Sequence, residues 1–252
     1  MKFINTITKK LARKIAKFIL PELKNLFQDE LSYSNHNLKY KMQQIASEDT
    51  AHFVLDNIPI NKAFKDRYSL LAYCCNLLKE REKDTNGAIL EFGVWKGSTI
   101  NHMANILPNL QFFGFDSFEG LSEPWIFNDK GAFGNIKELP MVKENVKLIK
   151  GYFNDTLPSF ISSNKEDIRL IHIDCDLYSS TVTILENISH LLKPGLLIIF
   201  DEFFNYPGWR EGEYKAWIEF SNKNNIQYQY LGYTYQKNEK MKSGQQVALQ
   251  IL

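Results

Sequence analysis

Short apolar runs alternate with helical patterns from Ala88 to the end of the chain. The apolar runs predict seven strands, over residues 88–94, 111–116, 146–153, 168–174, 195–202, 226–237 and 245–252. Helical spacing predicts helices over residues 66–83, 96–107, 181–192 and 214–222. Strands that alternate with helices are typical of a parallel sheet covered on both faces, and the last two strands fit an antiparallel pair at its edge. The pattern predicts an α/β fold with a doubly wound, mostly parallel, seven-stranded sheet.

The N-terminal segment has the pattern of an amphipathic helix with a basic polar face. Its apolar positions recur at Phe3, Ile7, Leu11, Ile15 and Phe18, and we expect Pro21 to end or kink the helix. Residues 1–24 carry seven basic side chains against one acid. Such a helix packs as an arm on a partner subunit or lies on an anionic membrane surface, and both interpretations stay open. Residues 28–66 are polar and give no clear pattern. We expect an arm and lead-in over 1–64 and the main domain over 65–252.

The composition is that of an ordinary globular protein, with 44% hydrophobic and 23% charged residues. A net charge of +1 gives no indication of a nucleic-acid partner. The three cysteines, two of them adjacent at Cys74 and Cys75, argue against a disulfide framework and favour a reducing, cytoplasmic setting. No apolar run is long enough for a transmembrane helix, and the N-terminus lacks the uninterrupted apolar core of a signal peptide.

Two motifs indicate a nucleoside site at the ends of the first two strands. In "LEFGVWKGST" a strand ends near Glu91, a turn with Gly93 follows, and a helix begins near Ser98, so that backbone N–H groups are free to meet a ligand. In "FGFDSFEGL" Asp116 ends the second strand. In many doubly wound folds an acid at this position accepts hydrogen bonds from the hydroxyls of a ribose. The G-x-G-x-x-G order of the dinucleotide fingerprint is absent.

Four acids follow the two later strands of the parallel part. Asp174 and Asp176 lie in "IHIDCDLYSST", and Asp201 and Glu202 in "LIIFDEFF". The carboxyl ends of parallel strands meet at one edge of the sheet, where open α/β proteins bind their ligands. These motifs contain no obvious compensating Arg or Lys, so we expect a divalent cation among the acids. All-oxygen ligation suits Mg²⁺, Mn²⁺ or Ca²⁺ and argues against a zinc site made of cysteine and histidine. The stretch 124–140 is expected to be a loop over this site.

Other side chains near these acids allow a functional or a purely structural interpretation. His172 precedes Asp174 by two residues and would compete with Asp176 as a catalytic base, or it is a hydrogen-bonded core residue. In "NYPGWREGEYKAW", Tyr206, Trp209 and Arg210 either contact a substrate or pack the loop, and the sequence does not decide between these roles.

The ordered motifs "LEFGVWKGS", "FGFDSFEGL", "KGYFNDTLP", "HIDCDLYSST" and "LLKPGLLIIFDEF" resemble those of the macrocin and novobiocin-pathway sugar O-methyltransferases. The resemblance covers residues 65–252. It implies a Rossmann-like class I methyltransferase fold that uses S-adenosylmethionine and a divalent metal to methylate a sugar hydroxyl. It also implies an N-terminal helical arm that takes part in homodimer contacts, which suits residues 1–24.

The resemblance assigns roles residue by residue. Asp174 and Asp201 match metal ligands, Glu202 stands where the family commonly has an aspartate, and Asp176 matches the general base. The positions that match the cofactor site are Glu91, Gly93, Val94, Ser98, Asp116, Ser117, Phe153 and Asp174.

The acceptor is less closely defined than the reaction. We expect a nucleotide-activated sugar for a bacterial surface polysaccharide, a capsule or O-antigen, with the sugar of an antibiotic-type glycoside as the alternative. Two other classes of function remain open, a NAD-dependent oxidoreductase on a similar fold and a non-catalytic binding protein that kept the fold.

Overall fold

The structure, a computed structural model, describes residues 15–25, 36–81, 87–235 and 244–252. The chain divides into two compact units, residues 1–45 and 46–252. In the first unit residues 15–25 form a helix that continues past Pro21, and its apolar side chains, such as Phe18, are exposed. The basic segment 1–14 lies outside the described residues. None of the described helices is both long enough and apolar enough to cross a membrane.

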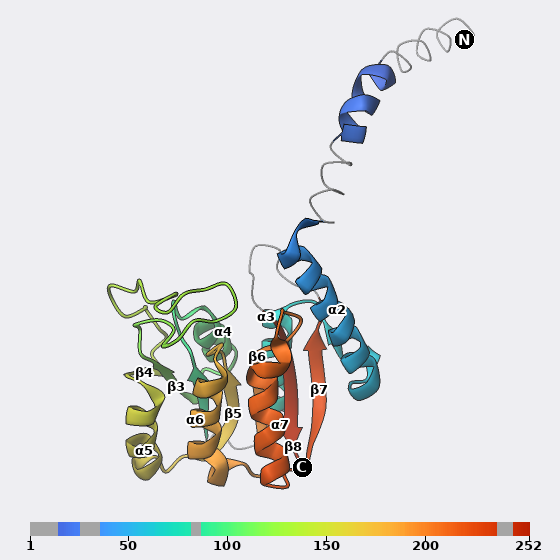
Figure 1. Cartoon of the computed structure of the whole chain (residues 1–252). Helices are drawn as coiled ribbons and strands as arrows, with labels where there is room; N and C mark the ends of the chain where they lie inside the picture. The colour runs from blue at the N-terminus through green and yellow to red at the C-terminus, as the bar shows by residue number, and fades with distance from the viewer. Residues whose placement is uncertain (1–14, 26–35, 82–86, 236–243) are drawn as a thin grey trace, which may run out of the picture. The chain divides into compact units, whose positions relative to one another are not determined.

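The second unit is built on one eight-stranded sheet (Figure 1). Its strand order is β1-β7-β8-β6-β5-β2-β3-β4. The strands are β1 (Ala63–Phe64), β2 (Ala88–Phe92), β3 (Gln111–Asp116), β4 (Val146–Lys150), β5 (Ile168–Ile173), β6 (Leu197–Phe204), β7 (Tyr228–Thr234) and β8 (Gln245–Ile251). Pairing is parallel from β6 to β4 and between β1 and β7, whereas β8 runs antiparallel to both of its neighbours.

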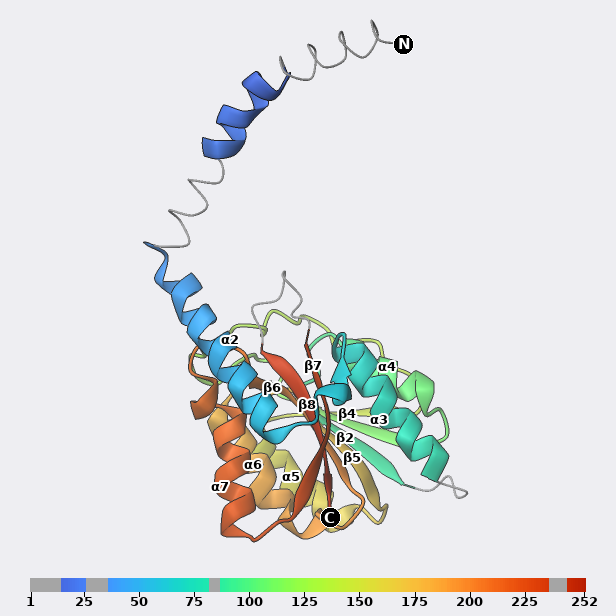
Figure 2. The same cartoon turned by 90° about the vertical axis from the view of Figure 1, so that its right-hand side faces the viewer.

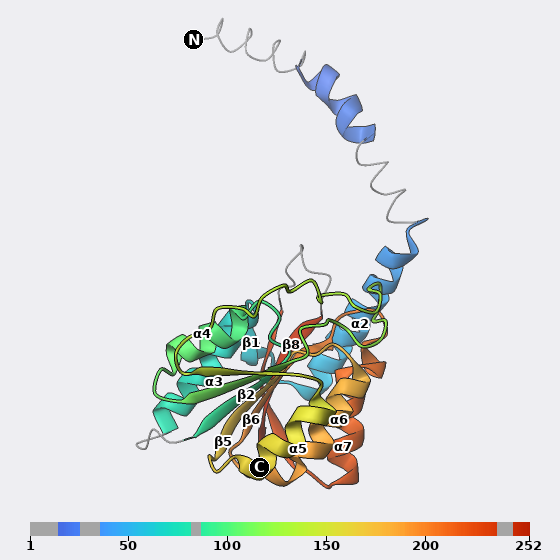
Figure 3. The same ribbon diagram turned by 90° about the vertical axis from the view of Figure 1, so that its left-hand side faces the viewer.

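Helices cover both faces of this sheet. The helices α3 (Arg67–Arg81) and α4 (Ser98–Ile106) lie on one face, and α5 (Phe153–Ser163), α6 (Tyr178–Ile188) and α7 (Glu213–Lys223) lie on the other (Figures 2 and 3). Because successive side chains of a strand point to opposite faces, each central strand supplies both cores. Leu90, Ile171 and Ile198 belong to one core, and the preceding or following residues Ile89, Leu170 and Ile199 belong to the other. The doubly wound, mostly parallel arrangement is confirmed.

Several elements differ from the prediction in extent. The sheet has an eighth strand, β1, whose two residues are too short to leave an apolar run. The predicted strand over 146–153 ends at Lys150, because Gly151 takes a φ of +145° and α5 begins at Phe153. The helix predicted from residue 181 begins at Tyr178.

The helix α2 (Leu38–Asn57) occupies part of the polar segment 28–66, which shows no clear pattern in the sequence. Within the second unit, its Phe53 ring contacts the rings of Trp209 and Tyr214 at centroid distances of 5.6 and 5.4 Å. Residues 46–57 therefore pack with the sheet unit, ahead of the 64/65 boundary that we predict.

Candidate active site

A cavity of about 1160 Å³ lies at the carboxyl ends of the parallel strands. Its wall includes the turn after β2, the end of β3, the segment after β5 and part of the stretch between β3 and β4. Trp125, Phe133 and Ile136 line it from that last stretch, so the loop predicted over 124–140 does border the site. The turn after β2 and the segment after β5 therefore border the same cavity.

The glycine turn after β2 is tightly packed. Gly93 has a φ of +93°, and a Cβ added there would lie 1.7 Å from the main-chain oxygen of Asp174. The amide of Asp174 donates to the carbonyl of Phe92 at 2.8 Å, which holds β5 against the turn. Gly97, also with positive φ, precedes the first residue of α4 and provides no side-chain cap. The turn therefore requires glycine, and it leaves the N-terminus of α4 without a side-chain partner.

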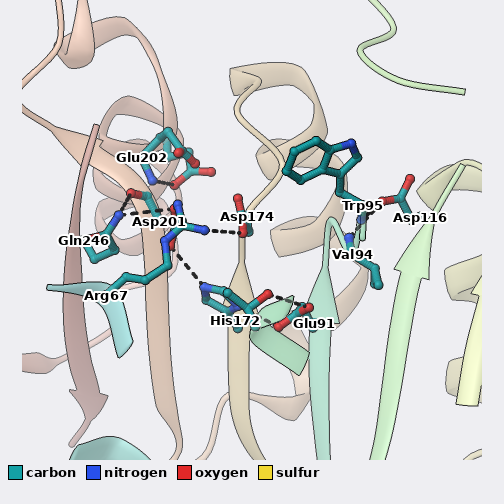
Figure 4. Close-up of polar contacts among 12 residues, drawn as sticks. Arg67, Glu91, Val94, Trp95, Asp116, His172, Asp174, Asp201, Glu202 and Gln246 are labelled. Carbon is teal, nitrogen blue, oxygen red and sulfur yellow. Dashed lines mark hydrogen bonds and ion pairs between the residues drawn. The ribbon is translucent and has the colours of Figure 1, made fainter. Parts of the chain in front are cut away.

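Asp116 holds this turn from the neighbouring strand. Its Oδ2 accepts hydrogen bonds from the amides of Val94 at 2.8 Å and Trp95 at 2.7 Å. Its Oδ1 accepts one from the amide of Phe118 at 2.7 Å. Trp95 takes a positive φ of 47°, which is uncommon for a bulky residue. Figure 4 shows its indole above the strand ends, between Asp116 and Asp174.

Glu91 and His172 form a buried pair beneath the cavity. The Oε2 of Glu91 lies 2.9 Å from Nδ1 of His172, and Oε1 accepts a hydrogen bond from Oγ1 of Thr99 at 3.0 Å. Both side chains are fully buried and neither lines the cavity. Burial lowers the pKa of His172, but its contacts with Asp201 and Glu91 outweigh burial and raise that pKa to about 10. These contacts favour the protonated form of His172, whose side chain is fully buried and lies outside the cavity lining.

Arg67 provides a positive charge beside the acids Asp174 and Asp201, although it lies outside the motifs that contain them. It is the first residue of α3, and its guanidinium pairs with Oδ2 of Asp201 and lies 3.6 Å from Oδ2 of Asp174. The pKa of Arg67 is raised, because the charges of Asp201 and Asp174 outweigh the effect of burial. Asp201 also accepts a hydrogen bond from Nε2 of Gln246 on β8 at 3.2 Å (Figure 4). Its own pKa stays below the usual value, since Arg67 and His172 outweigh burial.

Three other acids face one another beside this ion pair. Carboxylate oxygens of Asp174, Asp176 and Glu202 all lie within 4.8 Å of one another, and all three residues line the cavity. Burial and the charge of Asp201 raise the pKa of Asp176 to about 7 and that of Glu202 well above its usual value. The Oε2 of Glu202 is buried and has no hydrogen-bond partner. Such a cluster is suited to holding a cation through oxygen ligands.

Glu213 is a further acid that the sequence did not single out. It is the first residue of α7, fully buried, and its Oε2 accepts a hydrogen bond from the main-chain amide of Glu202 at 3.1 Å. Glu213 directly precedes the helix predicted over 214–222, but its proximity to Glu202 depends on how α7 packs against β6. It fixes the backbone at the end of the acid cluster.

The family of the chain follows from comparison with known proteins. The model of the macrocin O-methyltransferase family matches residues 65–231, which contain all of the motifs described above. The chain belongs to this family. The membership agrees with the resemblance seen in the sequence, and it counts against an oxidoreductase that uses NAD.

Two curated relatives show how far this likeness extends. A tetracenomycin-C rhamnosyl 4'-O-methyltransferase of Streptomyces olivaceus is 27% identical over 141 residues, 46% of this chain and 53% of that protein. The demethyldecarbamoylnovobiocin O-methyltransferase of Streptomyces niveus is 24% identical over 166 residues, 54% of this chain and 61% of that protein. The matches thus span between about half and three fifths of the length of these relatives.

Two solved methyltransferase structures share the fold of this chain. The calicheamicin methyltransferase CalS11 aligns with a TM-score of 0.55 at 21% identity, over 85% of this chain and 93% of that chain. The O-methyltransferase NovP aligns with a TM-score of 0.53 at 21% identity, over 73% and 78%. The class I methyltransferase fold is confirmed.

The structure separates the predicted site residues of this macrocin-family chain into two groups. Those that line the cavity are Gly93, Val94, Ser98, Asp116, Ser117, Phe153, Asp174, Asp176 and Glu202. Glu91, His172 and Asp201 are fully buried and lie outside its lining.

Aromatic side chains of the segment that follows β6 pack into the protein core. Tyr206 and Trp209 are buried in the core, and the Arg210 guanidinium pairs with Asp49 of α2. None of the three lines the cavity. The sequence left open whether these side chains contact a substrate or pack the loop. In this structure they pack the loop.

Proposed function

We propose that the protein is an S-adenosylmethionine-dependent O-methyltransferase that methylates a sugar hydroxyl with the help of a divalent metal ion. The observation that carries the proposal is the single cavity shared by the glycine turn after β2 and the acid cluster after β5 and β6. Asp174 stands where the two meet: its backbone abuts Gly93 and its side chain belongs to the cluster. A cofactor held by the turn would thus present its reactive group to the acids.

The residues present fit S-adenosylmethionine. The turn has no space for a Cβ at Gly93, the start of α4 has no side-chain cap, and Asp116 ends β3 as an acid that ribose hydroxyls can reach. Glu91 would act from beneath, through the Thr99 hydroxyl at the start of α4. Ser117 and Phe153 line the same cavity and would border the nucleoside.

The residues present also fit a divalent ion such as Mg²⁺ or Mn²⁺. Asp174 and Glu202 would hold it with one further carboxylate, Asp201 by likeness to the family or Asp176 by proximity. The buried, unpartnered Oε2 of Glu202 supports this assignment, since an uncompensated buried carboxylate is costly. A bound ion would lower the pKa of a coordinated hydroxyl and orient it.

The chemistry is an in-line displacement, in which the sugar oxygen forms a bond to the methyl carbon as the bond from sulfur to carbon breaks. S-adenosylmethionine supplies the electrophilic methyl group. The chain contributes alignment, because two reactants held in attacking geometry react far faster than free ones. Asp176 lines the cavity and is proposed to accept the hydroxyl proton, and its pKa, raised to about 7, suits a general base near neutral pH. The products are S-adenosylhomocysteine and the methyl ether.

The names of the relatives support a glycoside acceptor. One matched relative is named for a rhamnosyl group on tetracenomycin and the other for a novobiocin precursor. We therefore place the sugar of an antibiotic-type glycoside first and a nucleotide-activated sugar for a surface polysaccharide second. Both acceptors present a hydroxyl to the same acid cluster.

Two further assignments concern the setting of the protein. We propose a homodimer that uses the N-terminal arm, supported by the exposed apolar side chains of residues 15–25, such as Phe18 and Leu20. Contact of residues 1–24 with an anionic membrane surface is the alternative, which binding to phosphatidylserine vesicles would reveal. Cys74, Cys75 and Cys175 form no disulfide bond, which supports a reducing, cytoplasmic setting.

The first experiment is a calorimetric titration of the full chain with S-adenosylmethionine, S-adenosylhomocysteine and NAD, with and without Mg²⁺. Binding of the first two but not NAD is expected. Formation of S-adenosylhomocysteine is then followed with a panel of rhamnosyl glycosides and sugar nucleotides. If neither sulfur nucleoside binds, the proposed reaction is excluded.

A further inference from the structure

Two aromatic side chains form an exposed pair on the wall of the cavity. The rings of Trp95, in the turn after β2, and Phe133, in the stretch between β3 and β4, have centroids 5.8 Å apart and planes 78° apart. Both residues line the cavity, and they are 39% and 41% exposed. A single exposed aromatic ring is ordinary, but two that meet in a ligand cavity provide an apolar surface for a bound molecule.

The backbone holds both rings in an unusual conformation. Trp95 and Phe133 have positive φ values of 47° and 67°, which are rare for bulky residues and cluster at functional sites. The amide of Trp95 donates to Oδ2 of Asp116 at 2.7 Å, and the amine of Lys96 lies 4.3 Å from the centroid of the indole. These contacts fix the position of the indole before any ligand binds.

Phe133 is held by the close approach of two segments of its loop. The amide of Leu121 donates to the main-chain oxygen of Ala132 at 2.9 Å. Gly134 follows Phe133, and a Cβ added there would lie 2.1 Å from the main-chain oxygen of Glu119. The two segments are therefore in tight contact on both sides of Phe133. A ring that is positioned in advance lowers the entropic cost of binding a ligand.

The aromatic pair stands next to the acids that are proposed to bind the acceptor hydroxyl. Figure 4 shows the indole of Trp95 above the strand ends, between Asp116 and Asp174. Asp174 belongs to the acid cluster. The cavity of about 1160 Å³ exceeds the roughly 300–1,000 Å³ that is usual for one ligand, so it has room for a second ligand beside the cofactor. A group attached to the acceptor sugar can thus reach Trp95 and Phe133.

Resting on the proposed function, we propose that Trp95 and Phe133 bind a planar ring carried by the acceptor, so that the substrate is a sugar joined to such a ring and not a free monosaccharide. A planar ring packs well on aromatic side chains, by offset stacking or by edge-to-face contact. The ring belongs to an aromatic aglycone or to the base of a nucleotide sugar, and both present the same flat apolar face. Trp95 and Phe133 then determine specificity and take no part in the transfer of the methyl group or the proton.

Calorimetric titration of the full chain, saturated with S-adenosylhomocysteine and Mg²⁺, tests this proposal with three probes. 4-Nitrophenyl α-L-rhamnoside carries a ring as its aglycone, thymidine diphosphate rhamnose carries one as its base, and methyl α-L-rhamnoside carries neither. The variants are Trp95→Ala and Phe133→Ala. Phe127→Ala is the matched control, because Phe127 lies in the same stretch as Phe133 and is 43% exposed, but does not line the cavity.

We expect the wild type to bind at least one of the ring-bearing probes about tenfold or more tightly than methyl rhamnoside. Each variant should lose about 10–100-fold in affinity for that probe, as for the loss of one stacked ring, and bind methyl rhamnoside within about threefold of the wild type. Phe127→Ala should keep the preference.

The preferred probe identifies the source of the ring. Tighter binding of the nitrophenyl glycoside assigns the ring to an aglycone, and tighter binding of the sugar nucleotide assigns it to a base. A preference that survives both Trp95→Ala and Phe133→Ala would come from the phosphates or from another contact, and it would overturn the proposal.

Folding and the proposed function are tested separately in the same series. The affinity of each variant for S-adenosylhomocysteine shows whether the turn after β2 is intact. Should Trp95→Ala lose that affinity, Trp95→Phe, expected to keep the preference for a ring, and Phe133→Leu, expected to lose it, carry the comparison. A wild-type protein that binds S-adenosylhomocysteine but prefers neither ring-bearing probe overturns this inference, while the methyltransferase assignment stands. If S-adenosylhomocysteine itself does not bind, the proposed function fails and this inference fails with it.

Discussion

The Nδ1 atom of His172 lies 2.9 Å from Oε2 of Glu91, and both side chains are completely buried. Together with Asp201 and Arg67 they form a row of alternating charges that crosses the sheet from β2 through β5 to β6 and α3. The row begins beside the glycine turn after β2 and ends at Arg67, which lines the cavity next to the acid cluster. Each charge in it is compensated by its neighbours, which is how charged groups are tolerated in a protein interior.

Replacing Glu91 with Gln keeps the shape of the side chain and removes its charge. The imidazolium of His172 would then lose its closest partner, and removing one member of a buried ion pair typically costs about 3–5 kcal/mol. We expect a loss of this size in the free energy of unfolding, measured with urea. The double variant Glu91→Gln with His172→Gln should recover part of that loss. A single variant within about 0.5 kcal/mol of the wild type would contradict the pairing.

Gly93 and Gly195 provide a matched pair for testing whether the turn after β2 binds the cofactor. Both have positive φ, +93° and +95°, but a Cβ at Gly93 would meet the backbone of Asp174 at 1.7 Å, whereas nothing lies within 4 Å at Gly195. Gly195→Ala should therefore cost only the conformational penalty, about 1–2 kcal/mol, and leave S-adenosylhomocysteine binding unchanged. Gly93→Ala should abolish that binding by displacing the turn. Calorimetric titration of the two variants distinguishes these results, and equal affinities would show that the turn tolerates a side chain.

The Asp49–Arg210 pair links α2 to the segment after β6 and should be weak. Arg210 donates two hydrogen bonds of 2.8 Å to Asp49, but both side chains are more than a third exposed. Asp49→Asn should reduce the free energy of unfolding by less than about 1 kcal/mol at pH 7, and less still at high salt. The hydrogen bond and the charge of Arg210 hold the pKa of Asp49 below its ordinary value of 3.8, against the effect of burial.

The sign of the pH dependence of this pair follows from that shift. A carboxyl whose pKa is lower in the folded state contributes stability above its unfolded pKa, and the contribution is lost as the pH falls through the folded pKa. The difference between wild type and Asp49→Asn should therefore be constant from pH 7 to pH 5, begin to fall near pH 3.8, and vanish only when the pH is below the lowered pKa of folded Asp49. Urea titrations across this range measure it, with Lys215→Gln, which breaks an exposed helix pair, as control. A difference that grows on acidification would be inconsistent with the pair.

The sequence predicted the parallel strands well because they are buried on both faces and therefore read as continuous apolar runs. It did not predict α2, although the buried positions Ala46, Thr50, Phe53 and Val54 follow helical spacing, because polar residues surround them. The two-residue β1 leaves no pattern at all.

The candidate site was predictable as a location but not as a set of contacts. The strand ends placed the four acids at one edge of the sheet, and Asp174, Asp176 and Glu202 do line the cavity there. Arg67 carries no local signal, since it stands 134 residues from its partner Asp201 and meets it only through the packing of α3 on the sheet. Glu213 likewise meets Glu202 only through α7.

Asp176 provides the most direct test of the chemical step. It lines the cavity with a positive φ of 64°, and its carboxylate is proposed to take the proton from the sugar hydroxyl. Asp176→Asn should lower the single-turnover rate by about 10²–10⁴-fold, the usual contribution of a general base, and leave S-adenosylmethionine affinity within about threefold. Rates are compared at saturating Mg²⁺ for wild type and variant, with Cys175→Ala, a neutral change of another cavity residue, as control.

A loss of rate in Asp176→Asn has two physical explanations, and the acidity of the acceptor separates them. An acceptor whose hydroxyl is made more acidic by a neighbouring fluorine needs less help from a base, so the variant should recover most of its rate with such an acceptor. If Asp176 only shaped the cavity, the deficit would be the same for both acceptors. A constant deficit across acceptors of different acidity would therefore assign Asp176 to positioning and leave the proton to another group.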